Sequence, residues 1–189
     1  AICGDKETAA IDKKIAQVYA DALKKLDPPA VEALKADQKA MLAARDQAFG
    51  GEDFSLRDYL DYRQIQLESL DPEPRKTFEG AWINMGGSVT VGRGEKHLEA
   101  AVSTSDGTVG RWLCDFTGIA REDGDALVIL ENPEEEAAFE GWTLRLTRNG
   151  NTLAVAAVPP AGAKADDQAP FCGAGGSIAG TFIAAKTDF

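Results

Sequence analysis

The hydrophobic period of this 189-residue chain changes once, and that change constrains the fold more than any other feature. Apolar residues recur at helical spacing as far as Leu70, whereas from Phe78 onward they alternate with polar residues, as in half-buried strands. Between the two lies Asp71-Pro72-Glu73-Pro74, which cannot continue a helix and is typical of a linker. We therefore predict an α+β protein, with a helical domain at residues 1–71 and an antiparallel β domain at residues 77–189.

Three helices are expected before the linker, each bounded by residues that cap or stop a helix. A helical unit of this size buries little core by itself, so we expect it to lean on the β domain. The first helix begins near Asp5 and ends at Asp27-Pro28-Pro29, the second begins at Pro28 and stops at Gly50-Gly51, and the third runs from Ser55 to Asp71.

Two polar residues, Gln38 and Arg45, interrupt the otherwise apolar stripe of the second helix. Buried polar groups must be paired to be tolerated. We therefore expect interhelical hydrogen bonds here, with Asp12 or Tyr19 of the first helix as the partners. Arg63 stands on the stripe of the third helix and belongs to the same set of structural polar pairs.

Seven to nine short strands are expected in the β domain, separated by turns rich in Gly, Asn and Asp. No helix among them could make a parallel crossover, so the strands form an antiparallel meander. Such a meander either closes into a small barrel or packs as a two-layer sandwich. The strand candidates are residues 80–85, 88–92, 96–104, 108–116, 118–121, 126–131, 141–148, 152–158 and 177–184.

The three cysteines indicate one disulfide. Cys114 and Cys172 both fall in the β domain, and we expect them to pair; the alternative is two reduced, buried thiols. The β-rich domain and the absence of an initiator Met favour an oxidising compartment. Cys3 is left over, either free or paired with something upstream of Ala1.

The net charge of −11 argues against nucleic-acid binding, which needs a basic surface. Residues 1–76 hold 12 basic and 15 acidic residues, whereas the remainder holds 8 and 16, so the β domain is the acidic part. A field of that sign attracts cationic partners, although solubility alone would also explain it. The candidate partner-binding residues are Glu134, Glu135, Glu136 and Glu140, in a loop between two strands; the alternative is a solvated acidic loop.

No complete catalytic or metal-binding pattern is present. The single histidine, His97, has no accompanying nucleophile motif, and no pair of Cys or His residues has ligand spacing. Asp123-Gly124-Asp125 lacks the further acidic positions of a calcium loop and is expected to be a hairpin turn. We therefore expect a protein that is not an enzyme and uses no cofactor; an envelope hydrolase using His97 is a weaker alternative. No stretch is apolar enough for a transmembrane segment.

The helical part resembles the N-terminal domain of the LprI-type lysozyme-inhibitor family, over about residues 1–70. The chain departs from the family pattern where Met41 replaces a tryptophan and where cysteines near Phe49 and at Ser55 are absent. The matching residues are Ile2-Cys3-Gly4-Asp5, Ile11-Asp12, Ile15, Tyr19, Gln38, Met41-Leu42, Arg45-Asp46, Ser55-Leu56, Tyr59 and Arg63.

This resemblance implies a periplasmic or secreted protein that binds a cationic protein such as lysozyme and inhibits it. Because the family cysteines are absent, we expect the interface with the β domain to hold the helices in place. A small-molecule or lipid carrier is the alternative if the strands enclose an apolar cavity. The oligomeric state is left open by the sequence.

Overall fold

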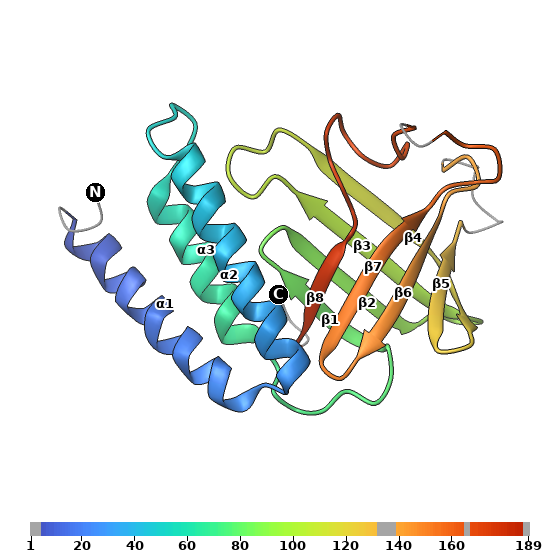
Figure 1. The fold of residues 1–189 in the computed structure, drawn as a ribbon, viewed down its shortest axis with the longest axis horizontal. Helices are drawn as coiled ribbons and strands as arrows, with labels where there is room; N and C mark the ends of the chain where they lie inside the picture. Colours follow the sequence, from blue (N-terminus) through green and yellow to red (C-terminus); the bar gives the residue numbers. More distant parts are fainter. Residues whose placement is uncertain (1–4, 132–138, 165–166, 187–189) are drawn as a thin grey trace.

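The structure, a computed structural model that describes residues 5–131, 139–164 and 167–186, confirms the α+β class. Three helices precede eight antiparallel strands, which close into a barrel in the order β1 to β8 (Figure 1). The elements are α1 (Lys6–Lys25), α2 (Pro28–Ala48), α3 (Leu56–Ser69), β1 (Gly80–Asn84), β2 (Gly87–Arg93), β3 (Leu98–Ser105), β4 (Leu113–Asp123), β5 (Ala126–Leu130), β6 (Thr143–Asn149), β7 (Thr152–Val158) and β8 (Gly180–Ala185).

Each helix begins at a side chain that satisfies free backbone N–H groups. The Asp5 carboxylate accepts from Glu7 and Thr8, the Asp27 carboxylate accepts from Ala30, and the Ser55 hydroxyl accepts from Asp58. These caps are local in sequence, which is why the helix starts could be predicted.

The barrel closes where β1 pairs with β8, with Trp82 opposite Ala184 and Ile83 opposite Ile183. Closure decides between the barrel and the sandwich that the sequence left open. The interior is filled by buried side chains, as expected for eight strands, and this argues against the lipid-carrier alternative. The largest of these side chains are Trp82, Phe116, Phe182, Leu127, Ile129, Leu144, Leu146 and Leu153.

The predicted strands 108–116 and 118–121 are wrong in their boundaries, because one continuous strand, β4, replaces them. Residues 106–112 form a connection in which the Asp106 side chain accepts hydrogen bonds from Thr108 and Arg111, so local bonding competes with strand pairing. Gly118 does not interrupt the strand. It lies so close to the Leu130 backbone that any side chain would collide there, and glycine thus permits β4 to pair with β5.

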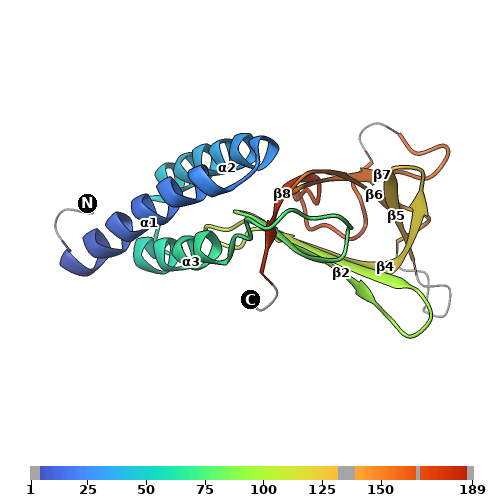
Figure 2. The same cartoon turned by 90° about the horizontal axis from the view of Figure 1, so that it is seen from below.

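The helices pack on the outer surface of β1 and β8, and they project to one side of the barrel (Figures 1 and 2). Four outward-facing barrel residues, Ala81, Ile83, Ile183 and Ala185, are buried in this layer. β1 and β8 are therefore buried on both faces, whereas β2 and β7 keep an exposed face. The helical side of this shared core consists of Ile15, Leu26, Ala30, Leu34, Met41, Tyr59, Leu60, Leu67 and Leu70.

Asn151, in the turn between β6 and β7, joins the helices, the linker and the barrel. Its backbone N–H donates to the Asp27 carboxylate at 2.8 Å, so the cap of α2 also receives a bond from the barrel. Its side-chain amide donates to the carbonyls of Asp71 and Glu73 and accepts from the Arg75 N–H. Asn151 is 1% exposed, which makes these bonds necessary for its burial.

The neighbouring Gly150 offers a test of this junction. Its φ is +58°, and a Cβ added there would collide with the Asp27 carboxylate. We expect Gly150→Ala to lower the free energy of unfolding by about 2–4 kcal/mol, combining backbone strain with displacement of Asp27. Urea unfolding followed by circular dichroism measures the change.

Gly124 is the matched control, because it lies in a hairpin turn with φ +65° and has no atom within 4 Å of an added Cβ. Gly124→Ala carries the backbone strain alone, so about 1–2 kcal/mol is expected. Equal losses in the two variants would show that the Asp27 contact contributes nothing.

Candidate functional site

The connections at one end of the barrel are long and acidic. At this end, which we call the loop end, β3 leads to β4, β5 to β6, and β7 to β8. Residues 105–115, 131–142 and 159–179 hold nine acidic and two basic residues. At the opposite end, residues 70–79, 93–98, 121–126 and 148–152 hold seven acidic and six basic residues. Counting described residues alone, the loop end holds five acidic and two basic residues, a net charge of −3, against −1 for the segments named at the opposite end.

A disulfide ties two segments of the loop end together. Cys114, at the start of β4, is bonded to Cys172, which is the pairing predicted from the sequence. Two backbone hydrogen bonds flank it, from Asp115 N–H to the Phe171 carbonyl and from Gly173 N–H to the Leu113 carbonyl. The segment before β8 is therefore held against β4. Cys3 lies outside the described residues.

Aromatic side chains pack together at the loop end of the barrel interior. Phe139 stacks on Phe116 with ring centroids 4.3 Å apart, and Phe171 meets Phe116 edge-on at 5.0 Å. The Phe139 N–H also donates to the Glu131 carboxylate. Glu140 follows directly, exposed and with a φ of +53°, so its side chain is presented at the surface from an anchored position. Glu134, Glu135 and Glu136 lie outside the described residues.

The connection between β3 and β4 is organised around the carboxylate of Asp106. Burial raises the pKa of Asp106, but hydrogen bonds from Thr108 and Arg111 outweigh burial and bring the pKa down to about 2. Since the folded-state pKa lies below the ordinary value, these bonds stabilise the fold above about pH 4 and are lost as the pH falls toward 2. Asp106 is therefore ionised at neutral pH, with the guanidinium of Arg111 beside it.

The polar residues predicted on the helix stripes form a different set of pairs from the one expected. Gln38 accepts two hydrogen bonds from Arg63 of α3, at 3.0 and 2.9 Å, and not from Asp12 or Tyr19. Arg45 pairs with its neighbour Asp46, at 2.8 Å. Neither Asp12 nor Tyr19 hydrogen-bonds to Gln38 or Arg45. The expected partners on the first helix were therefore wrong, because Arg63 of the third helix bonds to Gln38 instead.

The residue that sequence reasoning missed in this cluster is Asp37. Its carboxylate accepts from Arg63 at 2.7 Å and from the Met85 N–H of the barrel at 2.7 Å, and both ionic side chains are under 10% exposed. Gln66 accepts from Arg63 and donates to the Asn84 carbonyl, also of the barrel. The cluster thus links two helices to the turn after β1. Asp37 could have been suspected only from its position beside Gln38.

His97 lies in the exposed turn between β2 and β3, at the end of the barrel opposite the loop end. Its backbone carbonyl accepts from Gly94. The described residues hold no group of three or more His, Cys, Asp or Glu side chains arranged to bind a metal ion. No observation connects His97 with a nucleophile.

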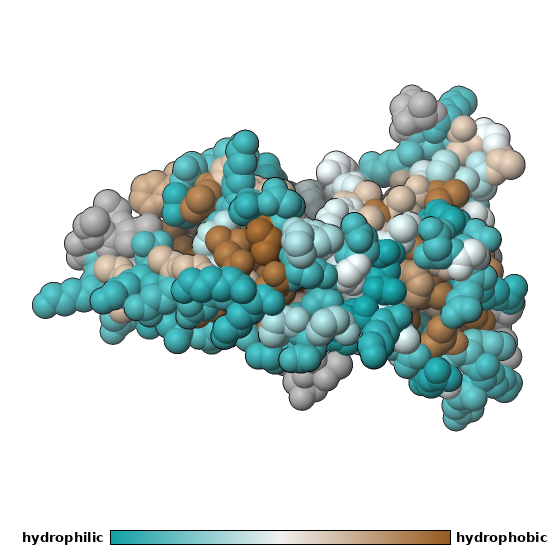
Figure 3. Space-filling model, turned by 60° about the horizontal axis from the view of Figure 1, so that its bottom comes forward, coloured by the Kyte–Doolittle hydropathy of each residue, from teal (hydrophilic) through white to brown (hydrophobic). Residues whose placement is uncertain are grey.

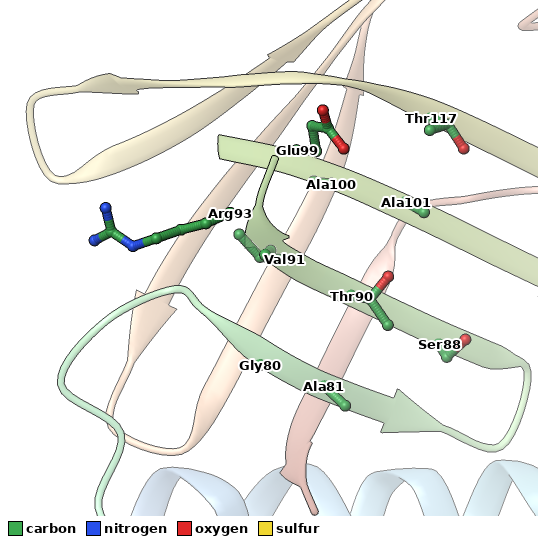
Figure 4. A pocket seen from close by; sticks show the side chains of 11 residues that line it. Gly80, Ala81, Ser88, Thr90, Val91, Arg93, Glu99, Ala100, Ala101 and Thr117 are labelled. Atoms are coloured by element: carbon green, nitrogen blue, oxygen red, sulfur yellow. The ribbon is translucent and has the colours of Figure 1, made fainter. Parts of the chain in front are cut away.

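A shallow groove of about 690 Å³ lies on the outer surface of β1 to β4 (Figure 4). Ser88, Thr90, Ala101 and Thr117 line it with small side chains from neighbouring strands, and Arg93 extends away from it at one end. Arg93 pairs with Glu79 at 3.1 Å. The groove offers hydroxyl and methyl groups without a cluster of charge, so its chemistry favours no particular ligand.

A second hollow, of about 290 Å³, lies between α1, α3 and the linker. Val18, Leu26 and Leu67 line its apolar part, and its rim carries both signs of charge, including Lys14 and Asp21. On the face shown in Figure 3, apolar surface gathers on the helical part and also on the barrel, between hydrophilic side chains. A rim of mixed charge does not select an ionic ligand.

Together these features define three helices packed on a filled β-barrel, with a disulfide at the end where the long connections lie. Residues 1–80 match the model of the family described as "Lysozyme inhibitor LprI". The resemblance of the helical part to that family is therefore confirmed, and the match ends where β1 begins. No curated protein and no solved structure matched the chain. None of α1, α2 and α3, the helices of the described part, is both long and apolar enough to cross a membrane.

Removing the disulfide tests how firmly the loop end is held. The cysteines are 58 residues apart, and constraining a loop of that length stabilises the fold by about 4 kcal/mol in the chain-entropy account. We expect the double variant Cys114→Ala, Cys172→Ala to lose about that much stability in urea. Limited proteolysis of the variant is expected to begin between residues 167 and 178. An unchanged unfolding midpoint would contradict a stabilising role.

Truncating the buried arginine tests the helix–barrel cluster. Arg63→Ala leaves the Asp37 carboxylate buried without its charge partner, so we expect a loss of about 3–5 kcal/mol in the free energy of unfolding. Arg57→Ala is the control, because the ion pairs of Arg57 with Glu7 and Asp61 are exposed, and it should cost less than about 1 kcal/mol. Similar losses in both variants would show that the buried cluster is not a special source of stability.

Proposed function

We propose that the protein is a periplasmic or secreted binding protein that inhibits a cationic lysozyme, and that the acidic loop end of the barrel faces the enzyme. The observation that carries the proposal is the match of residues 1–80 to the lysozyme-inhibitor family. The disulfide is consistent with an oxidising compartment outside the cytosol.

The charge distribution supports the choice of the loop end. A surface of one sign raises the association rate of a partner of opposite sign, and it disfavours partners of like sign. The described acidic residues Asp115 and Glu140 are exposed at this end. Glu134, Glu135 and Glu136 belong to the same connection in the sequence and are part of the proposed contact.

The way in which the barrel holds the loop-end connections also supports the choice of the loop end as the binding surface. A loop that binds a partner loses less entropy on binding when it is already held in place. Here the disulfide, the stacked Phe116 and Phe139, and the filled barrel interior hold the stems of the connections. The proposed surface therefore combines high negative charge with anchored stems.

A lysozyme turnover assay with several lysozyme classes tests the function directly. We expect inhibition at micromolar protein, and a weaker effect as salt is raised, because salt screens exposed charges. Absence of inhibition for every class at that concentration would overturn the proposal.

Charge reversal tests the surface. We expect the double variant Asp115→Lys, Glu140→Lys to raise the half-inhibitory concentration by about tenfold at low salt, mainly through slower association. The control is Glu95→Lys, Asp125→Lys, which makes the same change in net charge with exposed residues at the opposite end of the barrel. That control should stay within about twofold of the unmodified protein. Equal losses in the two variants would show that net charge matters and the loop end does not.

A further inference from the structure

A cleft of about 590 Å³ lies between α2 and the barrel. In Figure 1 the yellow-green connection between β3 and β4 lies beside α2, and the red segment that enters β8 runs next to this connection. The helical wall consists of alanines and Asp37, whereas the barrel wall carries mostly polar side chains and one tryptophan, Trp112. The volume is within the range of roughly 300–1,000 Å³ that small-molecule sites occupy.

The charged side chains that line the cleft are already paired. Asp37 accepts from Arg63 at 2.7 Å, and both of these side chains are under 10% exposed. Asp106 accepts from Arg111 and from the Thr108 hydroxyl. The two carboxylates are thus balanced by two guanidinium groups. Because no charge is left over to attract an ion, the cleft favours an uncharged occupant.

Several polar groups of the barrel wall have no internal partner. The described residues supply no hydrogen-bond partner to the indole N–H of Trp112 or to the hydroxyls of Ser105 and Thr181. Arg111 donates to Asp106 through Nε, and its two terminal nitrogens bond to no described residue. An apolar ligand would remove these groups from water without replacing their hydrogen bonds. The occupant must therefore bring hydrogen-bonding groups of its own.

Apolar surface lies beside these polar groups. The Trp112 ring is held against the segment before β8, since a Cβ added at Gly176 would lie 3.0 Å from its Cε3 atom. A pyranose sugar suits this combination, because its C–H groups pack on the electron-rich face of an aromatic ring while its hydroxyls form hydrogen bonds. The opposite wall offers the methyl groups of Ala33, Ala36, Ala40 and Ala44.

The walls of the cleft are fixed before any ligand enters. The Met85 N–H donates to Asp37 of α2, and the Thr104 hydroxyl donates to the Ser177 carbonyl in the segment before β8. A site between fixed walls needs little ordering on binding, which lowers the free-energy cost of binding.

A peptide fits the cleft less well than a sugar. Extended peptides bind by adding a strand to an exposed sheet edge, but the described strands close in the order β1 to β8 and offer no such edge. A helix that docks in a groove needs an apolar surface, and the polar groups of the barrel wall would oppose it.

We infer that this cleft binds a short, uncharged oligosaccharide. A pyranose ring packs on the indole of Trp112, and the sugar hydroxyls bond to the groups of the barrel wall that have no internal partner. The alanine face of α2 covers the other side of the ligand. This binding site goes beyond lysozyme inhibition and does not depend on it, so each can fail without the other.

The three tryptophans of the chain allow the site to be observed directly. Each gives one indole N–H signal in a ¹H–¹⁵N NMR spectrum, and Trp112→Phe and Trp142→Phe assign the signals. Cellotriose, maltotriose and tri-N-acetylchitotriose are titrated separately. We expect the Trp112 signal to move with at least one of them, with a dissociation constant of about 1 mM or tighter. The Trp82 signal should stay in place, because Trp82 is buried and its N–H donates to the Phe78 carbonyl.

Filling the cleft tests the position of the ligand. Ala40 and Ala36 are exposed residues of the helical wall, so Ala40→Phe and Ala36→Phe place a ring in the cleft. Ala20→Phe is the matched control, because Ala20 is exposed on α1 and does not line the cleft. We expect each cleft variant to weaken binding by at least about tenfold and the control to stay within about twofold. Thermal unfolding shows that each variant is folded.

Two further comparisons test the chemistry of recognition. Thr181→Val removes a hydroxyl with little change in shape, so binding should weaken by about two- to tenfold. The glucosamine trimer is a cationic analogue of cellotriose, and it should bind no more than about twofold tighter than cellotriose.

Four results would overturn the inference. The first is a Trp112 signal that none of the three neutral sugars moves at millimolar concentration. The second is a shift of the Trp142 signal alone, and the third is equal affinity in Ala40→Phe and Ala20→Phe, either of which would place the sugar elsewhere. The fourth is binding of the glucosamine trimer at least about tenfold tighter than that of cellotriose, which would identify a cation as the occupant.

Discussion

The packing of the helices on the outer surface of β1 and β8 is the interaction on which the rest of the structure depends. A three-helix unit of this length buries little core by itself. Here the helices and the barrel share one hydrophobic core, so the sheet supplies part of the apolar surface that the helices bury. This core includes Leu34, Met41 and Leu60 of the helices and Ile83 and Ile183 of the barrel. This shared apolar layer holds the helices against the barrel.

Burying a helix against a sheet also buries polar backbone at the ends of both, and two polar clusters satisfy it. At one end of the interface, Asn151 bonds to the cap of α2 and to the linker carbonyls. At the other, Asp37 receives the Met85 N–H while Arg63 supplies the opposite charge. A hydrophobic interface without these residues would leave unpaired groups, each costing about 1–3 kcal/mol. The clusters therefore define how the helices sit on the barrel.

That position also shapes the surface between α2 and the barrel. Because α2 is held beside the barrel along its length, its alanine face and the 105–112 connection enclose a cleft at the acidic end. Neither wall would form a concave surface alone. The match to a lysozyme-inhibitor family covers residues 1–80, whereas most of the acidic residues proposed to meet the enzyme lie in the barrel.

The sequence by itself determined the features that depend on near neighbours: three capped helices, the linker, most of the strands, the α+β class and the family resemblance. The Cys114–Cys172 pair was also predictable, because both cysteines fall in the β domain. Residues 108–116 were misjudged, since the bonds that Asp106 makes with Thr108 and Arg111 hold that segment out of the sheet. Tertiary structure alone decided barrel closure, the choice of Arg63 as the partner of Gln38, the role of Asn151 and the cleft beside α2. These join groups 25 to 124 residues apart, and their pairing depends on which surfaces are buried together, a choice that local periodicity does not specify.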